Sequence, residues 1–370
     1  MLGIYIHIPF CRAKCNYCDF NSHVSCEEER QAYIDALCRE IRTVKFDGDD
    51  TVDTVYFGGG TPTCLTPRQL IRILDAVRDR FTLDKACEVT SECNPATIGE
   101  EGLCALRAGG FNRLSIGIQS ANDEELKILG RIHSAADARE CVNSARSAGF
   151  DNISVDLMFG LPGQNEESFM KSVEFALSLE TTHISCYALK IEEGTPFLRM
   201  ELDLPSDDDS CDMYDLCADM LYKSGFKRYE ISNFARPGFE SRHNLKYWKC
   251  DDFLGFGAGA YSCAGGKRYS NISDTSGYIE KINSGLTAVC DCETLSKADM
   301  MSEFVFLGLR MADGISEKEF KRRFSADIFD VFDDALLKNI KRGTIVRENG
   351  RMRIPDKYIY VSNSIMVDFV

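Results

Sequence analysis

Short apolar runs alternate with amphipathic stretches along the first 225 residues. The apolar runs have the length of β-strands, and several are almost continuously apolar, which is typical of parallel strands buried on both faces. The stretches between them carry apolar residues at spacings of three and four, which predicts helices. Six strands are predicted, at Gly3–Ile8, Thr54–Phe57, Cys87–Glu92, Arg113–Gln119, Ile153–Phe159 and His183–Leu189.

Local signals mark the ends of several predicted helices. Thr66 begins a capping box with proline at the first helical position, and Ser134 and Ser206 each precede an aspartate by three residues. Gly149 and Gly225 follow helical patterns, where a left-handed residue commonly ends a helix. Six strand–helix units within residues 1–225 predict an α/β fold, a parallel (β/α)6 barrel that is partial or nearly closed.

The alternation ends after residue 225. Residues 226–292 are rich in Gly, Asn, Ser and aromatic residues, which predicts an extended connecting segment of loops and short strands. A hairpin that turns at Asn349-Gly350 is predicted near the end of the chain. Residues 293–370 are expected to form a small, mainly helical C-terminal domain, with helices at Glu303–Met311, Glu317–Arg323 and Phe329–Arg342.

The composition predicts a globular, cytoplasmic protein. Its 43 Lys and Arg residues face 58 Asp and Glu residues, so the net charge is −15. This acidity argues against broad nucleic-acid binding, which depends on basic residues that neutralise phosphates. No apolar run reaches the ~18 residues of a membrane span, and the N-terminus lacks a secretion signal pattern. We therefore expect neither a nucleic-acid partner nor a transmembrane segment.

Three of the 17 cysteines carry the first candidate chemistry. Cys11, Cys15 and Cys18 form C-x3-C-x2-C directly after the first predicted strand, where α/β barrels build active sites. Three thiolates can hold three irons of a [4Fe–4S] cluster and leave the fourth iron open. The alternative is a zinc site completed by His7 or His23. The other cysteines are irregularly spaced, as expected for small buried residues in a reducing compartment.

The surroundings of these cysteines resemble the cluster loop of radical S-adenosylmethionine (SAM) proteins. The resemblance is carried by Tyr5-Ile6-His7-Ile8-Pro9-Phe10-Cys11-x3-Cys15-x-Tyr17-Cys18. It is strengthened by Gly58-Gly59-Gly60-Thr61-Pro62-Thr63 after the second predicted strand. Glycines there let a ligand approach the backbone closely, and in this family the loop meets the amino group of SAM.

Later motifs are similar to those of one subgroup, the oxygen-independent coproporphyrinogen III oxidase-like proteins. They are Glu92-Cys93-Asn94-Pro95, Ser115-Ile116-Gly117-Ile118-Gln119-Ser120, Gly130-Arg131-x-His133 and Asp156-Leu157-Met158-x-Gly160-Leu161-Pro162-Gly163. The resemblance runs nearly end to end and implies a HemN-type C-terminal domain at residues 293–370. It also implies SAM contacts from Tyr5, Tyr17, Gly59, Gly60, Thr61, Glu92, Gln119, Arg131, Asp156, Ala188 and Tyr261.

The chain departs from the oxidase pattern in two places. Coproporphyrinogen oxidases carry a further cysteine two residues after the third, where this chain has Phe20. Residues 243–248 match H-N-x-x-Y-W, a signature of the HemW-like branch, whose members are regarded as haem chaperones. His243 in this motif is the candidate axial haem ligand, because imidazole suits iron. The alternative for His243 is a hydrogen-bonded structural histidine.

The resemblance implies a haem chaperone with a [4Fe–4S] cluster, SAM and haem as its cofactors. Its partners would be a haem-acceptor protein and a reductant for the cluster. The alternative is an oxygen-independent coproporphyrinogen III oxidase, which decarboxylates propionate side chains through a 5′-deoxyadenosyl radical. Phe20 is the residue that discriminates between the two. Radical modification of tRNA would need a basic groove or an RNA-binding appendage, and the net charge disfavours it.

Overall fold

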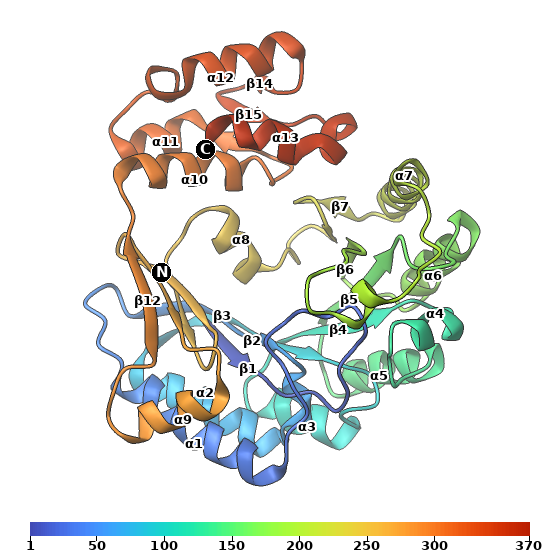
Figure 1. The fold of residues 1–370 in the computed structure, drawn as a ribbon, viewed down its shortest axis with the longest axis vertical. Helices are drawn as coiled ribbons and strands as arrows, with labels where there is room; N and C mark the ends of the chain where they lie inside the picture. Colours follow the sequence, from blue (N-terminus) through green and yellow to red (C-terminus); the bar gives the residue numbers. More distant parts are fainter.

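A curved sheet of twelve strands forms the centre of the molecule (Figure 1). The computed structural model describes all 370 residues. Six parallel strands pair in chain order, β1 (Leu2–Ile8), β2 (Thr51–Gly59), β3 (Thr82–Cys93), β4 (Arg113–Gln119), β5 (Asn152–Phe159) and β6 (His183–Ala188). All six predicted strands are confirmed, and β2 and β3 begin earlier than their apolar runs indicate.

Helices cover the outer face of these strands (Figure 1). They are α1 (Glu27–Thr43), α2 (Pro67–Arg80), α3 (Glu100–Ala108), α4 (Asp123–Ile128), α5 (Ala135–Ser147), α6 (Glu166–Ser178) and α7 (Asp207–Lys223). The predicted capping boxes form at Thr66, Ser134 and Ser206. Gly149 and Gly225 adopt positive φ angles of 88° and 86° after α5 and α7. The main core of 59 buried residues joins the strands to these helices.

The sheet remains open, so the barrel is partial. On one side β9 (Phe253–Phe256) pairs parallel with β1, and the sheet continues through the antiparallel strands β10 (Tyr261–Ala264), β11 (Lys267–Asn271) and β12 (Val289–Thr294). On the other side β8 (Asn233–Ala235) and β7 (Lys227–Arg228) extend the sheet beyond β6. β12 and β7 are the two edges and do not pair with each other.

The parallel strands are buried on both faces, as predicted, but only their outer face is apolar. Their outer residues, such as Val55, Val89 and Ile116, are fully or almost fully buried against the helices. Alternate residues on the inner face are polar and line a cavity, among them Tyr56, Glu92, Arg113, Ser115, Asp156 and Ser185. The interior of the barrel is therefore built to hold a polar ligand.

The connecting segment after residue 225 contains two helices that its composition did not predict. They are α8 (Arg242–Trp248), which carries the H-N-x-x-Y-W motif, and α9 (Thr275–Asn283). Ser241 caps α8 by accepting a hydrogen bond from the backbone amide of Asn244 at 3.4 Å. A helix of seven residues depends on tertiary contacts rather than on propensity, which explains why the sequence pattern did not reveal it.

The C-terminal part has its own hydrophobic core of 13 buried residues and lies beyond α8, at the top of Figure 1. Its helices are α10 (Lys297–Gly308), α11 (Glu317–Phe324), α12 (Ile328–Arg342) and α13 (Ser362–Met366). The predicted hairpin is confirmed as β14 (Val346–Glu348) and β15 (Arg351–Arg353), joined by β13 (Ile315–Ser316). Asn349 and Gly350 both adopt positive φ angles, as a tight hairpin turn requires. None of the helices combines the length and apolar character needed to cross a membrane.

Candidate functional site

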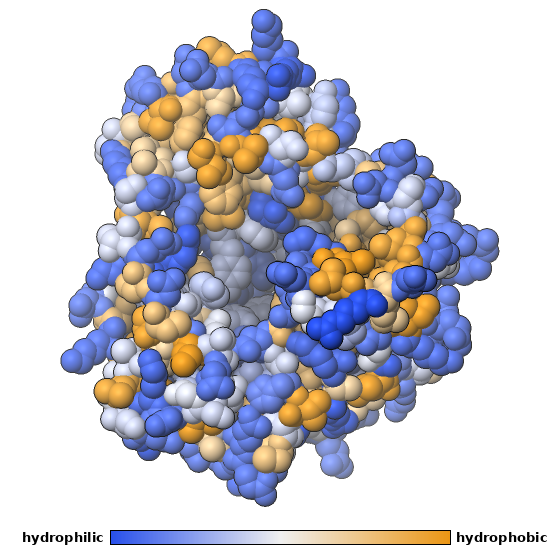
Figure 2. All heavy atoms as spheres, viewed as in Figure 1, coloured by the Kyte–Doolittle hydropathy of each residue, from blue (hydrophilic) through white to orange (hydrophobic).

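A cavity of about 380 Å³ lies on the inner face of the parallel strands. Its opening is visible as a hollow between the barrel and the C-terminal part (Figure 2). Such a volume lies within the range of small-molecule binding pockets. Twelve of the predicted site residues line it: Cys11, Cys15, Cys18, Tyr17, Gly59, Gly60, Thr61, Glu92, Gln119, Arg131, Asp156 and Ala188. Tyr5, Tyr261 and His243 are not among the lining residues.

The three motif cysteines lie at the carboxyl end of the strands, in the loop that follows β1. All three thiols are free, and all line the cavity. The Thr61 hydroxyl donates a hydrogen bond to Cys11 Sγ at 3.6 Å, and Arg131 Nη1 donates one to Cys15 Sγ at 3.7 Å. Hydrogen bonds of this kind orient thiolates that bind metals.

The two histidines that could complete a zinc site are engaged elsewhere. His7 Nε2 lies 2.8 Å from the carbonyl oxygen of Asn21, and His7 Nδ1 lies 3.0 Å from the Tyr5 hydroxyl. His23 Nε2 pairs with Glu29 Oε1 at 2.8 Å. No three His, Cys, Asp or Glu side chains converge closely enough to coordinate a single ion. The arrangement therefore gives no support to the zinc alternative.

The glycine loop after β2 packs directly against the cysteine loop. Gly59 has a φ of 110°, and a Cβ there would lie 2.5 Å from Cε1 of the His7 ring. A Cβ on Gly60 would lie 2.7 Å from the carbonyl oxygen of Phe10. The Gly60 and Thr61 backbone amides donate to carbonyl oxygens of the first segment at 2.8 Å. The close approach of the loop to the His7 ring at Gly59, and to the backbone of the first segment at Gly60, thus requires these glycines.

Glu92 of β3 and Asp156 of β5 both line the cavity. Burial, together with the charge of nearby Asp156, raises the pKa of Glu92 to about 7, and the Tyr56 hydroxyl, which donates to Glu92 at 3.0 Å, opposes this shift. Burial likewise raises the pKa of Asp156, which accepts a hydrogen bond from Ser115 at 3.4 Å. Carboxylates in such a site can accept hydrogen bonds from amino or hydroxyl groups of a ligand.

The raised pKa of Glu92 predicts a pH-dependent stability of the ligand-free protein. The folded state binds a proton at Glu92 more tightly than the unfolded state, so this contribution is present below pH ~4.5 and is lost as pH rises through about 7. We expect the Glu92→Gln variant to gain stability relative to the parent over that interval, measured by urea unfolding at several pH values. Glu101→Gln on the exposed face of α3 is the control, and equal pH profiles for parent and Glu92→Gln would contradict the assignment.

Arg131 lies at the cysteine end of the cavity. It donates hydrogen bonds to Asn94 Oδ1 at 2.9 Å and to the carbonyl oxygen of Gly117, besides its contact with Cys15. Its Nε is enclosed and has no partner. A guanidinium held in this way can pair with a carboxylate that binds beside the cysteine loop.

His243, the predicted haem ligand, is buried beneath the cavity and does not line it. Only 1% of the residue is exposed. Its Nδ1 is 2.9 Å from the Thr54 hydroxyl, and its Nε2 is 2.8 Å from the Tyr247 hydroxyl. Burial lowers the pKa of His243 to about 3, so the ring is neutral. Both ring nitrogens have hydrogen-bond partners in the protein, the arrangement expected of a structural histidine.

Of the three tyrosines predicted to contact SAM, Tyr17 lines the cavity, whereas Tyr5 and Tyr261 lie outside its lining. Tyr5 stacks on the Tyr56 and His243 rings, at centroid distances of 6.4 and 6.5 Å, and donates or accepts a hydrogen bond with His7. Tyr261, at the start of β10, is 62% exposed. Tyr5 thus supports residues of the inner face, whereas Tyr261 lies on the surface.

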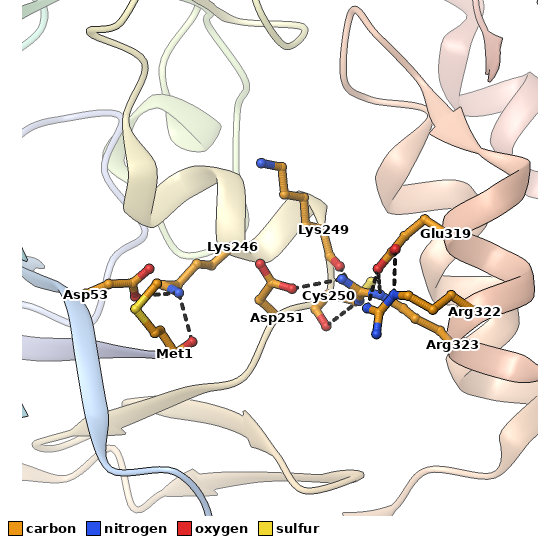
Figure 3. A network of polar contacts seen from close by, with 9 residues as sticks. All are labelled: Met1, Asp53, Lys246, Lys249, Cys250, Asp251, Glu319, Arg322 and Arg323. Carbon is orange, nitrogen blue, oxygen red and sulfur yellow. Dashed lines mark hydrogen bonds and ion pairs between the residues drawn. The ribbon is translucent and has the colours of Figure 1, made fainter. Parts of the chain in front are cut away.

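α8 is held in place from two sides (Figure 3). Toward the sheet, Lys246 Nζ forms an ion pair with Asp53 Oδ1 at 2.6 Å and donates to the carbonyl oxygen of Met1 at 3.1 Å. Toward the C-terminal part, Arg323 of α11 pairs with Asp251 Oδ1 at 2.9 Å and donates to two carbonyl oxygens just after α8. α8 therefore closes the cavity at the amino end of the strands, opposite the cysteine loop.

Several lining residues were not found from the sequence. Most are polar residues at alternate positions of the predicted strands, among them Tyr56, Arg113, Ser115, Ser185 and Tyr187. One more, Asn244, comes from α8. Two signals were available. Polar residues recur with period two inside strands that otherwise read as apolar, and the asparagine of the H-N-x-x-Y-W motif is as prominent as its histidine.

Comparisons with known proteins agree with this architecture. The Radical SAM superfamily model matches residues 5–176, and the HemN C-terminal domain model matches residues 295–360. A heme chaperone HemW from Lactococcus lactis is 34% identical, covering 99% of this chain and 96% of the relative. One from Bacillus subtilis is 35% identical, covering 100% and 99%.

A solved structure is similar over the whole chain. Coproporphyrinogen III oxidase (HemN) from Escherichia coli, described as a radical SAM enzyme, superimposes with a TM-score of 0.87 and 25% sequence identity. The match covers 100% of this chain and 89% of that enzyme. The predicted fold class and family resemblance are confirmed. The chain belongs to the radical SAM superfamily, and within it to the HemW-like branch of the coproporphyrinogen III oxidase-like family.

Proposed function

We propose that this protein is a haem chaperone, which binds a [4Fe–4S] cluster, SAM and haem and passes haem to an acceptor protein. The observation that carries the proposal is Phe20, in a chain that aligns from end to end with heme chaperones. Phe20 occupies the position of the oxidases' further cysteine, lines the cavity and is 62% exposed. A phenyl ring offers neither a thiol nor a proton donor there.

The donor set at the cysteine end fits an iron–sulfur cluster. Cys11, Cys15 and Cys18 would hold three irons, and their thiols already receive hydrogen bonds from Thr61 and Arg131. When bound, the cluster supplies an open iron and one-electron chemistry. Around it, these residues orient the sulfur ligands and leave the cavity open toward the inner face of the strands.

The same cavity has the groups that SAM requires. Arg131 would pair with its methionine carboxylate, and Glu92 and Asp156 would accept hydrogen bonds from its amino and ribose hydroxyl groups. Gly59 and Gly60 keep the wall beside the cysteine loop free of side chains. The residues carried over from the family thus have compatible chemistry at one end of the cavity.

The open side of the cavity suits a flat, largely apolar ligand such as haem. Phe20 and Tyr187, which are 62% and 40% exposed, line it from the cysteine loop and from β6. Aromatic side chains can cover the face of a macrocycle, and their exposure is otherwise unfavourable. We place bound haem against these two residues.

The second candidate function is oxygen-independent coproporphyrinogen III oxidation, and the similarity of the whole fold to the Escherichia coli enzyme favours it. It would use the same cluster and SAM residues and differ in what lies at position 20. The experiment that separates the two measures haem binding and coproporphyrinogen consumption in parallel, on one anaerobically reconstituted preparation. The chaperone proposal predicts haem binding without consumption of the porphyrinogen.

A further inference from the structure

Arg113 is a buried cation with no partner in the protein. It opens β4, is 2% exposed and lines the cavity. Its Nε is enclosed without a hydrogen-bond acceptor, and its guanidinium forms no hydrogen bond or ion pair with any residue. A guanidinium removed from water without a partner is unfavourable, because the charge loses its hydration. An acceptor supplied by a ligand would resolve this.

Three carboxyl groups lie near Arg113, but each accepts hydrogen bonds from other donors. Glu88 accepts hydrogen bonds from backbone amides at the start of α8 at 3.0 and 3.3 Å. Glu92 accepts from a tyrosine hydroxyl on β2, and Asp156 from a serine hydroxyl on β4. None of the three lies within ion-pair distance of Arg113. The terminal nitrogens of Arg113 are therefore free to donate hydrogen bonds to a ligand in the cavity.

Asn244 provides a second free donor in the same compartment. Its side-chain amide makes no hydrogen bond within the protein, and it lines the cavity from α8. Successive helical residues point about 100° apart, so the neighbouring His243 faces away, into the buried layer beneath. The motif thus presents its asparagine to a ligand, while its histidine packs against the sheet.

Arg113 and Arg131 mark opposite ends of the cavity. Arg131 contacts Cys15 at the carboxyl end of the strands. Arg113 is the first residue of its strand and lies toward α8, which closes the amino end. Two separate cationic positions suit two separate carboxylate-bearing ligands, and the proposed function brings two such ligands to this cavity, SAM and haem.

We propose that Arg113 and Asn244 form a carboxylate subsite that takes a propionate side chain of the bound tetrapyrrole. This inference rests on the proposed function. A guanidinium binds a carboxylate through two parallel N–H donors, and the Asn244 amide can donate to the same group. The subsite would anchor one propionate at the end of the cavity remote from the cysteines, and so fix the orientation of a macrocycle that lies against Phe20 and Tyr187.

The test compares haemin with its dimethyl ester, which has the same macrocycle but no free carboxylate. We expect the reconstituted parent protein to bind the free acid at least roughly ten-fold more tightly than the ester. In Arg113→Gln this preference should fall to about one, through loss of affinity for the free acid alone. Arg113→Lys, which keeps the charge but not the planar fork, should retain part of it. Arg107→Gln on α3 is the control and should behave as the parent.

The outcomes separate this inference from the proposed function. Equal affinity of the parent protein for free acid and ester overturns the subsite while haem binding stands, and this comparison needs no variant to fold. A loss of SAM affinity in Arg113→Gln, with the preference for free haem intact, assigns Arg113 to the methionine carboxylate and also overturns it. Failure of the parent to bind either tetrapyrrole overturns both the subsite and the chaperone proposal.

Discussion

We expect the Cys15→Ala variant to lose the iron–sulfur absorbance completely after anaerobic reconstitution, while its secondary structure stays intact. The cysteine loop supplies only three thiols to the cavity, so removal of one leaves too few ligands to retain a cubane cluster. SAM binding should fall with the cluster, since the open iron is one of its anchoring points. Iron and sulfide analysis, the visible spectrum and far-ultraviolet circular dichroism measure this result.

The matched control is Cys104→Ala. Cys104 is an exposed cysteine on α3, away from the cavity, and its removal should leave the iron content at the parental value. Retention of a full cluster in Cys15→Ala would contradict the assignment. Uptake of stoichiometric zinc without iron by the parent protein would contradict it equally and revive the single-ion alternative.

The second large effect is expected at His243, on stability rather than on haem ligation. His243→Ala removes hydrogen bonds to Thr54 and Tyr247 and leaves a cavity between α8 and the sheet. We expect the free energy of unfolding to fall by about 2–4 kcal/mol, measured by urea denaturation. The Soret band of bound haem should keep its position, because the ring faces away from the cavity.

Tyr247→Phe is the control for this prediction. It removes one hydroxyl from the same contact and should cost only about 1 kcal/mol of stability, again with an unchanged Soret band. The Soret bands of the two variants are compared at a temperature where both are folded. A shift in His243→Ala that Tyr247→Phe does not show would contradict the structural role. In that case the imidazole leaves its buried position to bind iron.

The cysteine and glycine loops could be predicted from sequence because their chemistry is local. The three cysteines lie within eight residues of one another, and the glycines follow a strand that the apolar pattern locates. Parallel strands place such loops at one end of a barrel, so the contact between Thr61 and Cys11 follows from topology. Helix caps such as Thr66 are equally local and were found for the same reason.

The opposite end of the cavity could not be predicted, because it arises from tertiary contacts. α8 is too short to be recognised by periodicity and depends on Glu88, Lys246 and Arg323 for its position. Its placement decides that Asn244, and not His243, meets the cavity. Likewise, Arg113 reads as an ordinary charged residue at a strand end until the fold buries it.

The measurement that tests the account most directly follows porphyrinogen turnover in a preparation that binds haem. The anaerobically reconstituted protein is first titrated with haemin, and then supplied with SAM, a low-potential reductant and coproporphyrinogen III. The account predicts saturable haem binding and no protoporphyrinogen or carbon dioxide above the level of Cys15→Ala. Cluster-dependent formation of protoporphyrinogen by the parent protein would contradict it and establish the oxidase function instead.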